Sequence, residues 1–194
     1  MKRGLFMTET KTKSKFTVLD IALIPLFSAL IAVCAWVTIP IPGIPFTMQV
    51  FGVFTAIAIL GAKKGAVSIL IYILLGAVGV PVFSGFNGGI GALLGTTGGY
   101  IVGFLVSAFA YGIFDAIIRK NSFFITFFKM FASHIFCYIF GSVWYMAVYT
   151  KNTGAIGFFG ILMGCVIPYI IPDMVKIALA ILIGREVKKR VKFL

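Results

Sequence analysis

An acidic and a basic residue lie three positions apart in an apolar stretch near the C-terminus. Asp173 and Lys176 are the only pair of opposite charges within a predicted membrane-spanning segment. A spacing of three places both side chains on one face of a helix, within reach of each other. The pair either links helices as a neutral unit or forms a polar ligand site. Because ionisable side chains inside a membrane are costly and usually functional, the pattern favours the ligand site.

Four further polar residues lie where they can meet a ligand or support the structure. Asn87 is the one amide of a glycine-rich loop, and its Asn-Gly sequence favours an ordinary turn. Thr47 and Gln49 begin a predicted span and can either cap a helix or face an outer cavity. His134 has no acid nearby in the sequence, which favours a hydrogen-bonded core histidine over a proton relay. The sequence leaves these alternatives open.

The motifs of the common enzyme classes are missing from the sequence. It contains no Walker-type phosphate loop, no H-E-x-x-H motif and no serine elbow. Cys34, Cys137 and Cys165 are widely separated in apolar segments and are interpreted as small buried hydrophobic residues. An intramembrane enzyme would need several convergent acids, histidines or metal ligands. Asp173 and His134 alone are weak evidence for such an active site. We therefore predict no metal, no cofactor and no enzymatic activity, with any ATP hydrolysis on a separate chain.

The composition is that of an integral membrane protein. The 194 residues are 61% hydrophobic, and the mean hydropathy is +1.12. Charged residues make up 11%, less than half of the roughly 25% found in soluble domains. The net charge of +12 could indicate nucleic-acid binding, but the charge lies at loop ends. Membrane orientation and anionic lipid head groups explain that placement better.

The basic residues fall into four clusters separated by long apolar stretches. Loops rich in Lys and Arg stay in the cytoplasm, so each cluster marks the inner face of the membrane. Two crossings fit between successive clusters, which predicts six spans with both termini inside. Fifteen of the 17 Lys and Arg residues belong to these clusters: Lys2, Arg3, Lys11, Lys13 and Lys15; Lys63 and Lys64; Arg119, Lys120 and Lys129; and Arg185, Lys188, Lys189, Arg190 and Lys192.

The predicted fold is an all-α bundle of six transmembrane helices. Residues 18–184 form this domain, between basic cytoplasmic tails at 1–17 and 185–194. The last apolar stretch, Ala155–Ile183, is too long for one straight crossing, and Pro168 and Pro172 favour a break. We therefore interpret Ala155–Cys165 as an outer interfacial piece. The predicted spans are 18–39, 47–62, 65–80, 96–118, 125–149 and 168–184, with a tight inner turn at Lys63–Lys64 between the second and third.

The outer loops are rich in proline and glycine. Ten of the 22 glycines lie within residues 76–103. Irregular backbone cannot lie bare in lipid, so the loop at 81–95 must pack on the protein or line a cavity. The first outer loop cannot be helical because it contains Pro40, Pro42 and Pro45.

Small residues form a stripe on the first predicted span. Ser28 and Ala32 are four residues apart, a spacing that lets another helix approach closely. The spacing is common by chance in apolar helices and is weak evidence alone.

Three groups of motifs together resemble one known family. Ile39–Pro42 with Pro45–Gln49 looks like its first outer loop, and Pro168–Lys176 looks like its last helix. Its central motif is matched by Gly76–Phe83, Asn87–Gly89 and Gly95–Tyr100. The family is BioY, the biotin-binding S components of energy-coupling factor (ECF) transporters. The resemblance covers nearly all of residues 18–184, and the combination is specific although each motif alone is not.

The resemblance implies a six-helix S-component fold with an outward-facing pocket under the first and third loops of the chain. It implies that Asn87, Asp173 and Lys176 contact the head group of biotin. Further candidates for the pocket are Thr47, Gln49, Phe83, Gly88 and Tyr100. An S component for a different vitamin remains the alternative, because the fold accepts other ligands.

The resemblance also implies partners and a location. S components work with a transmembrane coupling subunit and two cytoplasmic ATPases in a bacterial or archaeal cell membrane. Ser28 and Ala32 match the spacing of the family's docking face, with Ser where Ala is usual. Thr96 stands where the family often has Pro. No arginine in the fourth span can hold the valerate carboxylate, which leaves backbone amides of the glycine loops as candidates.

Overall fold

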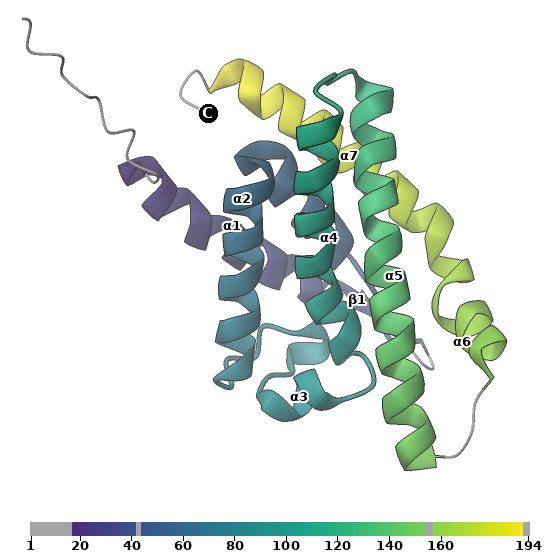
Figure 1. Cartoon of the computed structure of the whole chain (residues 1–194). Coiled ribbons are helices and arrows are strands. Elements are labelled where there is room, and N and C mark those ends of the chain that lie inside the picture. The colour runs from purple at the N-terminus through teal and green to yellow at the C-terminus, as the bar shows by residue number, and fades with distance from the viewer. Residues whose placement is uncertain (1–16, 42–43, 154–156, 192–194) are drawn as a thin grey trace, which may run out of the picture.

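The computed structural model describes residues 17–41, 44–153 and 157–191. Most of residues 1–17, together with Pro42, Ala155 and Lys192, lies outside the described residues. The predicted all-α architecture is confirmed, and a two-stranded hairpin in the first outer loop was not predicted (Figure 1). The elements are α1 (Val18–Trp36), β1 (Thr38–Ile39), β2 (Phe46–Thr47), α2 (Gln49–Ala77), the 3₁₀ turn η1 (Ser84–Phe86), α3 (Ile90–Leu94), α4 (Gly98–Ile117), α5 (Phe123–Thr153), α6 (Phe158–Cys165) and α7 (Ile167–Arg190).

A capping box fixes the start of α1. The Thr17 hydroxyl accepts from the backbone N–H of Asp20, and the Asp20 carboxylate accepts from the backbone N–H of Thr17. Each side chain satisfies a donor that the first turn of a helix leaves unpaired. Asp20 also forms an ion pair with Lys64, with Nζ and Oδ1 2.5 Å apart. The beginning of α1 is therefore tied to the middle of α2.

The long helix α2 folds back on itself at Gly61. Gly61 has φ 81° and ψ 170°, a conformation that almost only glycine adopts. The Gln49 side-chain amide donates to the Tyr72 hydroxyl at 2.7 Å. In a straight helix these two residues would lie about 34 Å apart along the axis. The segments 49–60 and 62–77 are therefore antiparallel arms joined at Gly61 (Figure 1).

The reversal corrects one detail of the sequence prediction. The predicted turn at Lys63–Lys64 lies two residues earlier, at Gly61, and both lysines belong to the first turn of the second arm. A side chain at Gly65 would come within 3.0 Å of the Ile57 backbone, so the arms pack closely just beyond the reversal.

Substituting Gly61 is expected to destabilise the fold. Gly61→Ala places a Cβ on backbone with φ 81°, which should lower the free energy of unfolding by about 1–3 kcal/mol. Gly164→Ala is the matched control, because this glycine lies in α6 with open space at its Cβ position. Unfolding of both variants in mixed micelles measures the difference. Equal stability of the two variants would mean that the reversal does not depend on the glycine conformation.

The number of spanning helices differs slightly from the six predicted spans. In the part of the chain that the structure describes, five helices are long and apolar enough to cross a membrane: α1, α2, α4, α5 and α7. Because α2 reverses at Gly61, its two arms account for two of the six predicted crossings.

The predicted break in the last apolar stretch is confirmed. The short helix α6 ends at Cys165, and α7 begins at Ile167. Pro168 falls in the first turn of α7, where its missing N–H would have had no helical partner. The helix continues to Arg190, six residues beyond the predicted end at Gly184.

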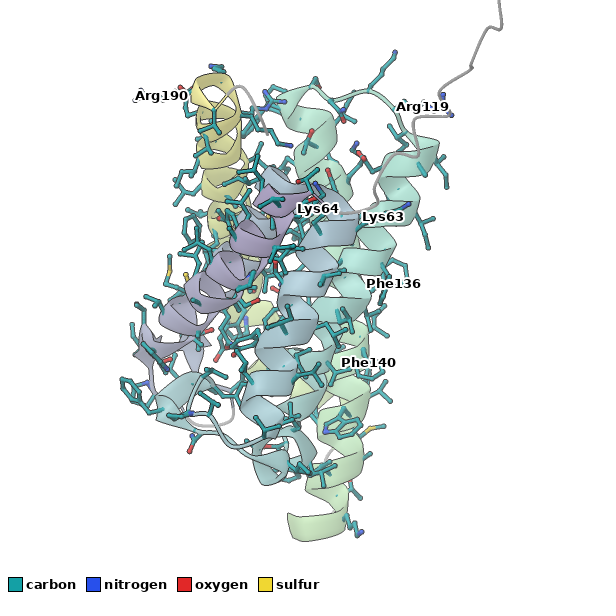
Figure 2. All side chains as sticks on the ribbon, turned by 90° about the vertical axis from the view of Figure 1, so that its left-hand side faces the viewer. Lys63, Lys64, Arg119, Phe136, Phe140 and Arg190 are labelled. Carbon is teal, nitrogen blue, oxygen red and sulfur yellow. The ribbon has the colours of Figure 1, made fainter. Side chains whose placement is uncertain are left out.

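The basic residues gather toward one end of the bundle. Figure 2 shows Lys63, Lys64, Arg119 and Arg190 near the same end, although they come from three different parts of the chain. The positive-inside rule assigns this end to the cytoplasm. Farther from that end, Phe136 and Phe140 project from the side of the bundle, and both rings are exposed (Figure 2). An apolar lateral surface of this kind suits contact with lipid.

Ser28 and Ala32 bring a helix close to α1, but the helix belongs to the same chain. The Ser28 hydroxyl lies 2.7 Å from the backbone oxygen of Ser68 in α2. Ser28 is 2% exposed and Ala32 is 5% exposed. The expectation that these two side chains form a docking face for a partner subunit stays a prediction, and in this structure both are buried, with Ser28 packed against α2.

Candidate ligand-binding site

A cavity of about 490 Å³ lies at the end of the bundle opposite the reversal at Gly61. Its volume falls within the range of about 300–1,000 Å³ typical of small-molecule sites. The walls come from α2, α4, α5, α7 and the two outer loops. The lining residues are Ile44, Pro45, Thr47, Gln49, Val50, Phe83, Ser84, Asn87, Gly88, Ala92, Gly95, Thr96, Thr97, Tyr100, Ile101, Phe104, His134, Cys137, Tyr138, Cys165, Tyr169, Asp173 and Lys176.

The cavity brings together every pocket residue that the sequence suggested. Segments far apart along the chain supply them: the first outer loop, the start of α2, the glycine-rich loop, α4 and α7. The eight residues are Thr47, Gln49, Phe83, Asn87, Gly88, Tyr100, Asp173 and Lys176. They lie at different depths in the cavity. Asp173 and Lys176 are buried, whereas Asn87 and Gly88 are exposed at the mouth.

The Asp173 carboxylate is the centre of a buried polar network. Lys176 donates to Oδ1 at 2.8 Å, and the Tyr138 hydroxyl donates to Oδ2 at 2.6 Å. His134 Nε2 lies 3.2 Å from the same Oδ2. All four side chains are at most 8% exposed. Three hydrogen-bond donors, one of which is the oppositely charged Lys176, compensate for the removal of the Asp173 carboxylate from water.

Lys176 links α7 to the first outer loop. Its ammonium donates to the backbone oxygen of Thr47 at 2.7 Å as well as to Asp173. The nitrogen also lies 3.9 Å from the centre of the Phe46 ring, a cation–π contact. The position of this charge is therefore fixed from both sides of the cavity.

The Asp173–Lys176 pair keeps one acceptor site and one donor for a ligand. An ionised carboxylate offers about four lone-pair sites, and three are used by Lys176, Tyr138 and His134. An ammonium has three N–H donors, of which two are used. A ligand group with an N–H next to a carbonyl, as in a cyclic urea or amide, can engage both.

Of the two roles that the sequence left open for Thr47 and Gln49, the structure shows the cavity-lining one, because the N-cap residue of α2 is Met48 and no side chain caps this helix. The Thr47 hydroxyl accepts from the backbone N–H of Gln49 at 3.2 Å, and both side chains line the cavity. The Gln49 amide is held by two side chains, with its oxygen 3.1 Å from the Thr47 hydroxyl and its nitrogen donating to Tyr72. The start of α2 is thereby fixed against the cavity wall.

The mouth of the cavity is pinned to the bundle by two tryptophans. Trp36 donates to the backbone oxygen of Pro81 at 2.9 Å, and Trp144 donates to that of Gly95 at 3.0 Å. Asn87 donates from its amide to the backbone oxygen of Ser84 at 3.0 Å, across the 3₁₀ turn Ser84–Phe86. Its own backbone is extended and pairs with Phe83, so Asn87 lies beside this turn rather than within an Asn-Gly turn, and its side chain lines the cavity.

Close packing at Gly98 holds the part of the mouth formed by Gly95 and its neighbours. A Cβ at Gly98 would lie 1.7 Å from the backbone oxygen of Leu93, so the chain could not keep this path. We expect Gly98→Ala to weaken ligand binding about tenfold or more, because forced overpacking moves backbone at a cost of roughly 1–3 kcal/mol. Gly91→Ala is the control in the neighbouring α3, where the added methyl meets open space. Ligand affinities of the two variants measure the effect, and equal affinities would contradict it.

Two residues of the network, His134 and Tyr138, were not predicted from the sequence to belong to the ligand site. His134 is a buried, hydrogen-bonded histidine, as the sequence favoured, but its partner is an acid 39 positions away. Tyr138 was not predicted at all. The spacing of four between His134 and Tyr138 places both on one face of α5, and this was the available signal.

The structure also shows where the other reactive side chains lie. Cys34, Cys137 and Cys165 are free and buried, as interpreted from the sequence. Among the residues that the structure describes, no three His, Cys, Asp or Glu side chains gather in a way that could hold a metal ion.

Comparison with known proteins gives one consistent result. A family model described as the BioY family matches residues 8–193. A protein of Pyrococcus horikoshii named "Probable biotin transporter BioY" is 37% identical over 169 residues, covering 87% of this chain and 96% of the relative. The "Biotin transporter BioY" of Thermotoga maritima is 37% identical over 178 residues, covering 84% and 92%.

A solved structure resembles the fold over most of its length. It is described as the S-component for biotin from an ECF-type ABC transporter. The TM-score is 0.76 with 26% sequence identity, and the match covers 89% of this chain and 92% of the other.

Proposed function

The chain belongs to the BioY family, and on that premise we propose that it is the substrate-binding S component of an ECF-type biotin uptake transporter. It is a multi-pass membrane protein and a transport subunit, not an enzyme. The observation that carries the proposal is the outward cavity with a buried acid–base pair at its deep end.

The chemistry of the cavity suits the head group of biotin. The ureido ring of biotin has two N–H donors and one carbonyl acceptor. Asp173 has a lone pair left for one N–H, and Lys176 has an N–H left for the carbonyl. Asn87, which the resemblance places at the head group, is exposed at the mouth and supplies an amide there. Phe83, Tyr100 and the other apolar lining residues suit the fused ring and the valerate chain.

The assembly around the chain is part of the proposal. We place the protein in the cell membrane of a bacterium or archaeon, with residues 18–184 as the binding domain and basic tails on the cytoplasmic side. A transmembrane coupling subunit and two cytoplasmic ATPases would supply the energy. The sequence supports this division of labour because it contains no phosphate-binding loop of its own.

A competition panel tests the proposal. The purified full chain in nanodiscs is incubated with labelled biotin and an excess of unlabelled biotin, thiamin or riboflavin. Only unlabelled biotin is expected to displace the label. Saturable binding of thiamin or riboflavin, with no binding of biotin, would make the chain an S component for another vitamin.

A further inference from the structure

The cavity contains no charge that is free to hold a carboxylate. Among the lining residues, all of which the structure describes, the charged side chains are Asp173 and Lys176, and these two are paired with each other at 2.8 Å. His134, which can also carry a charge, is directed at Asp173. The undescribed outer-loop residues 42–43 and 154–156 are Pro, Gly, Gly, Ala and Ile, which add no charge.

Lys176 cannot leave its partner without a large penalty. The whole residue is 4% exposed, and its ammonium donates to both the Asp173 carboxylate and the Thr47 backbone oxygen. Movement toward the mouth would leave the buried Asp173 carboxylate without its opposite charge, which is strongly unfavourable. Lys176 therefore stays at the deep end of the cavity, beside Asp173.

The opposite end of the cavity is neutral and open. Asn87 and Gly88 are exposed there, and Ser84, Thr96 and Thr97 are half-buried. These residues offer hydroxyl, amide and backbone groups but no cation. Lys151 lies near the outer end of α5, yet it is exposed and does not line the cavity.

We infer that the valerate end of biotin lies at this neutral mouth, where no charged side chain recognises its carboxylate. The inference rests on the proposed function and extends its ligand class. The site accepts uncharged valerate derivatives, including biotin esters and amides in which biotin is joined to the side chain of lysine. The buried acid–base pair selects the ureido head, and the mouth tolerates variation at the other end of the ligand.

Competition binding on the unmodified protein tests the inference. Labelled biotin bound to the full chain in nanodiscs is displaced by biotin, biotin methyl ester or biotinyl-lysine amide whose α-amine is acetylated. The two neutral derivatives are expected to bind within about tenfold of biotin. Loss of a hydrogen bond to a charged group usually costs more than that, so a larger loss would overturn the inference. If biotin itself does not bind, the proposed function fails instead, and the two failures are distinguishable.

Two variants check whether a basic residue reaches the carboxylate. Lys151→Gln should leave biotin affinity within about twofold of the parent protein, and a loss above tenfold would overturn the inference. Lys176→Gln should weaken biotin and its methyl ester by the same factor, because the lysine contacts the head that both share. A much larger loss for biotin than for the ester would show that Lys176 holds the carboxylate. The ligand series on the unmodified chain decides the matter even if a variant fails to fold.

Discussion

Asp173→Asn is expected to weaken biotin binding by at least about a hundredfold. The carboxylate receives Lys176, Tyr138 and His134, and an amide cannot accept all three because one of its two ends is a donor. The substitution also leaves the Lys176 charge buried without its counter-charge. Each lost hydrogen bond to a charged group costs about 1.5–3 kcal/mol, and the acceptor for a ureido N–H is lost as well. Equilibrium binding of labelled biotin to the folded variant measures the effect.

The chain contains its own matched control for this substitution. Glu186 and Lys189 form a second acid–base pair on α7 with the same spacing of three, and their side chains are 2.6 Å apart. Both side chains are exposed, unlike those of Asp173 and Lys176. Glu186→Gln should leave biotin affinity unchanged. Retention of full affinity by Asp173→Asn, with the control also normal, would remove the buried pair from the binding site.

The second large effect concerns stability and appears in a double-mutant cycle. Lys176→Met alone is expected to lower the free energy of unfolding by about 3–5 kcal/mol, because it leaves a buried carboxylate without its counter-charge. Combining it with Asp173→Asn should recover a large part of that loss, since both charges are then absent. The double variant should still fail to bind biotin. Unfolding in mixed micelles and biotin binding, measured on all four proteins, separate the two roles of the pair.

The same cycle on Glu186 and Lys189 provides the comparison. An exposed ion pair contributes at most about 1 kcal/mol, so Glu186→Gln and Lys189→Met should each have small, nearly additive effects. Additive effects at Asp173 and Lys176 as well would mean that their charges are not coupled in the folded protein.

The crossings and orientation could be predicted from sequence because they follow from a strong local penalty. A charged side chain in lipid is so costly that lysine and arginine mark the ends of the spans. The placement of Lys63, Lys64, Arg119 and Arg190 toward one end agrees with this rule. The break before α7 was predictable for a similar reason, because proline restricts the backbone wherever it occurs.

Details set by backbone conformation and by pairing were missed. The charge of Lys63–Lys64 suggested the turn, but the reversal needs a positive φ, and Gly61 is the nearby residue that adopts one without strain. The hairpin between β1 and β2 pairs Thr38 with Thr47 and Ile39 with Phe46. Its two strands are too short to show a periodic pattern in the sequence.

The residues of the site could be predicted individually, but not all of their contacts. The spacing of Asp173 and Lys176 was enough to predict their ion pair, because both lie on one helix face. The approach of His134 and Tyr138 to Asp173 depends on how α5 and α7 are rotated about their axes. The same uncertainty affected Ser28, whose small side chain indicated close helix packing without saying which helix would pack there.

Equilibrium binding of labelled biotin to the purified chain in nanodiscs, without any partner subunit, tests the central claim most directly. The account predicts tight, saturable binding at about one biotin per chain, because the described cavity and its acid–base pair come from this chain alone. Absence of binding to well-folded protein would contradict the account, because the proposed site would then not recognise the ligand by itself.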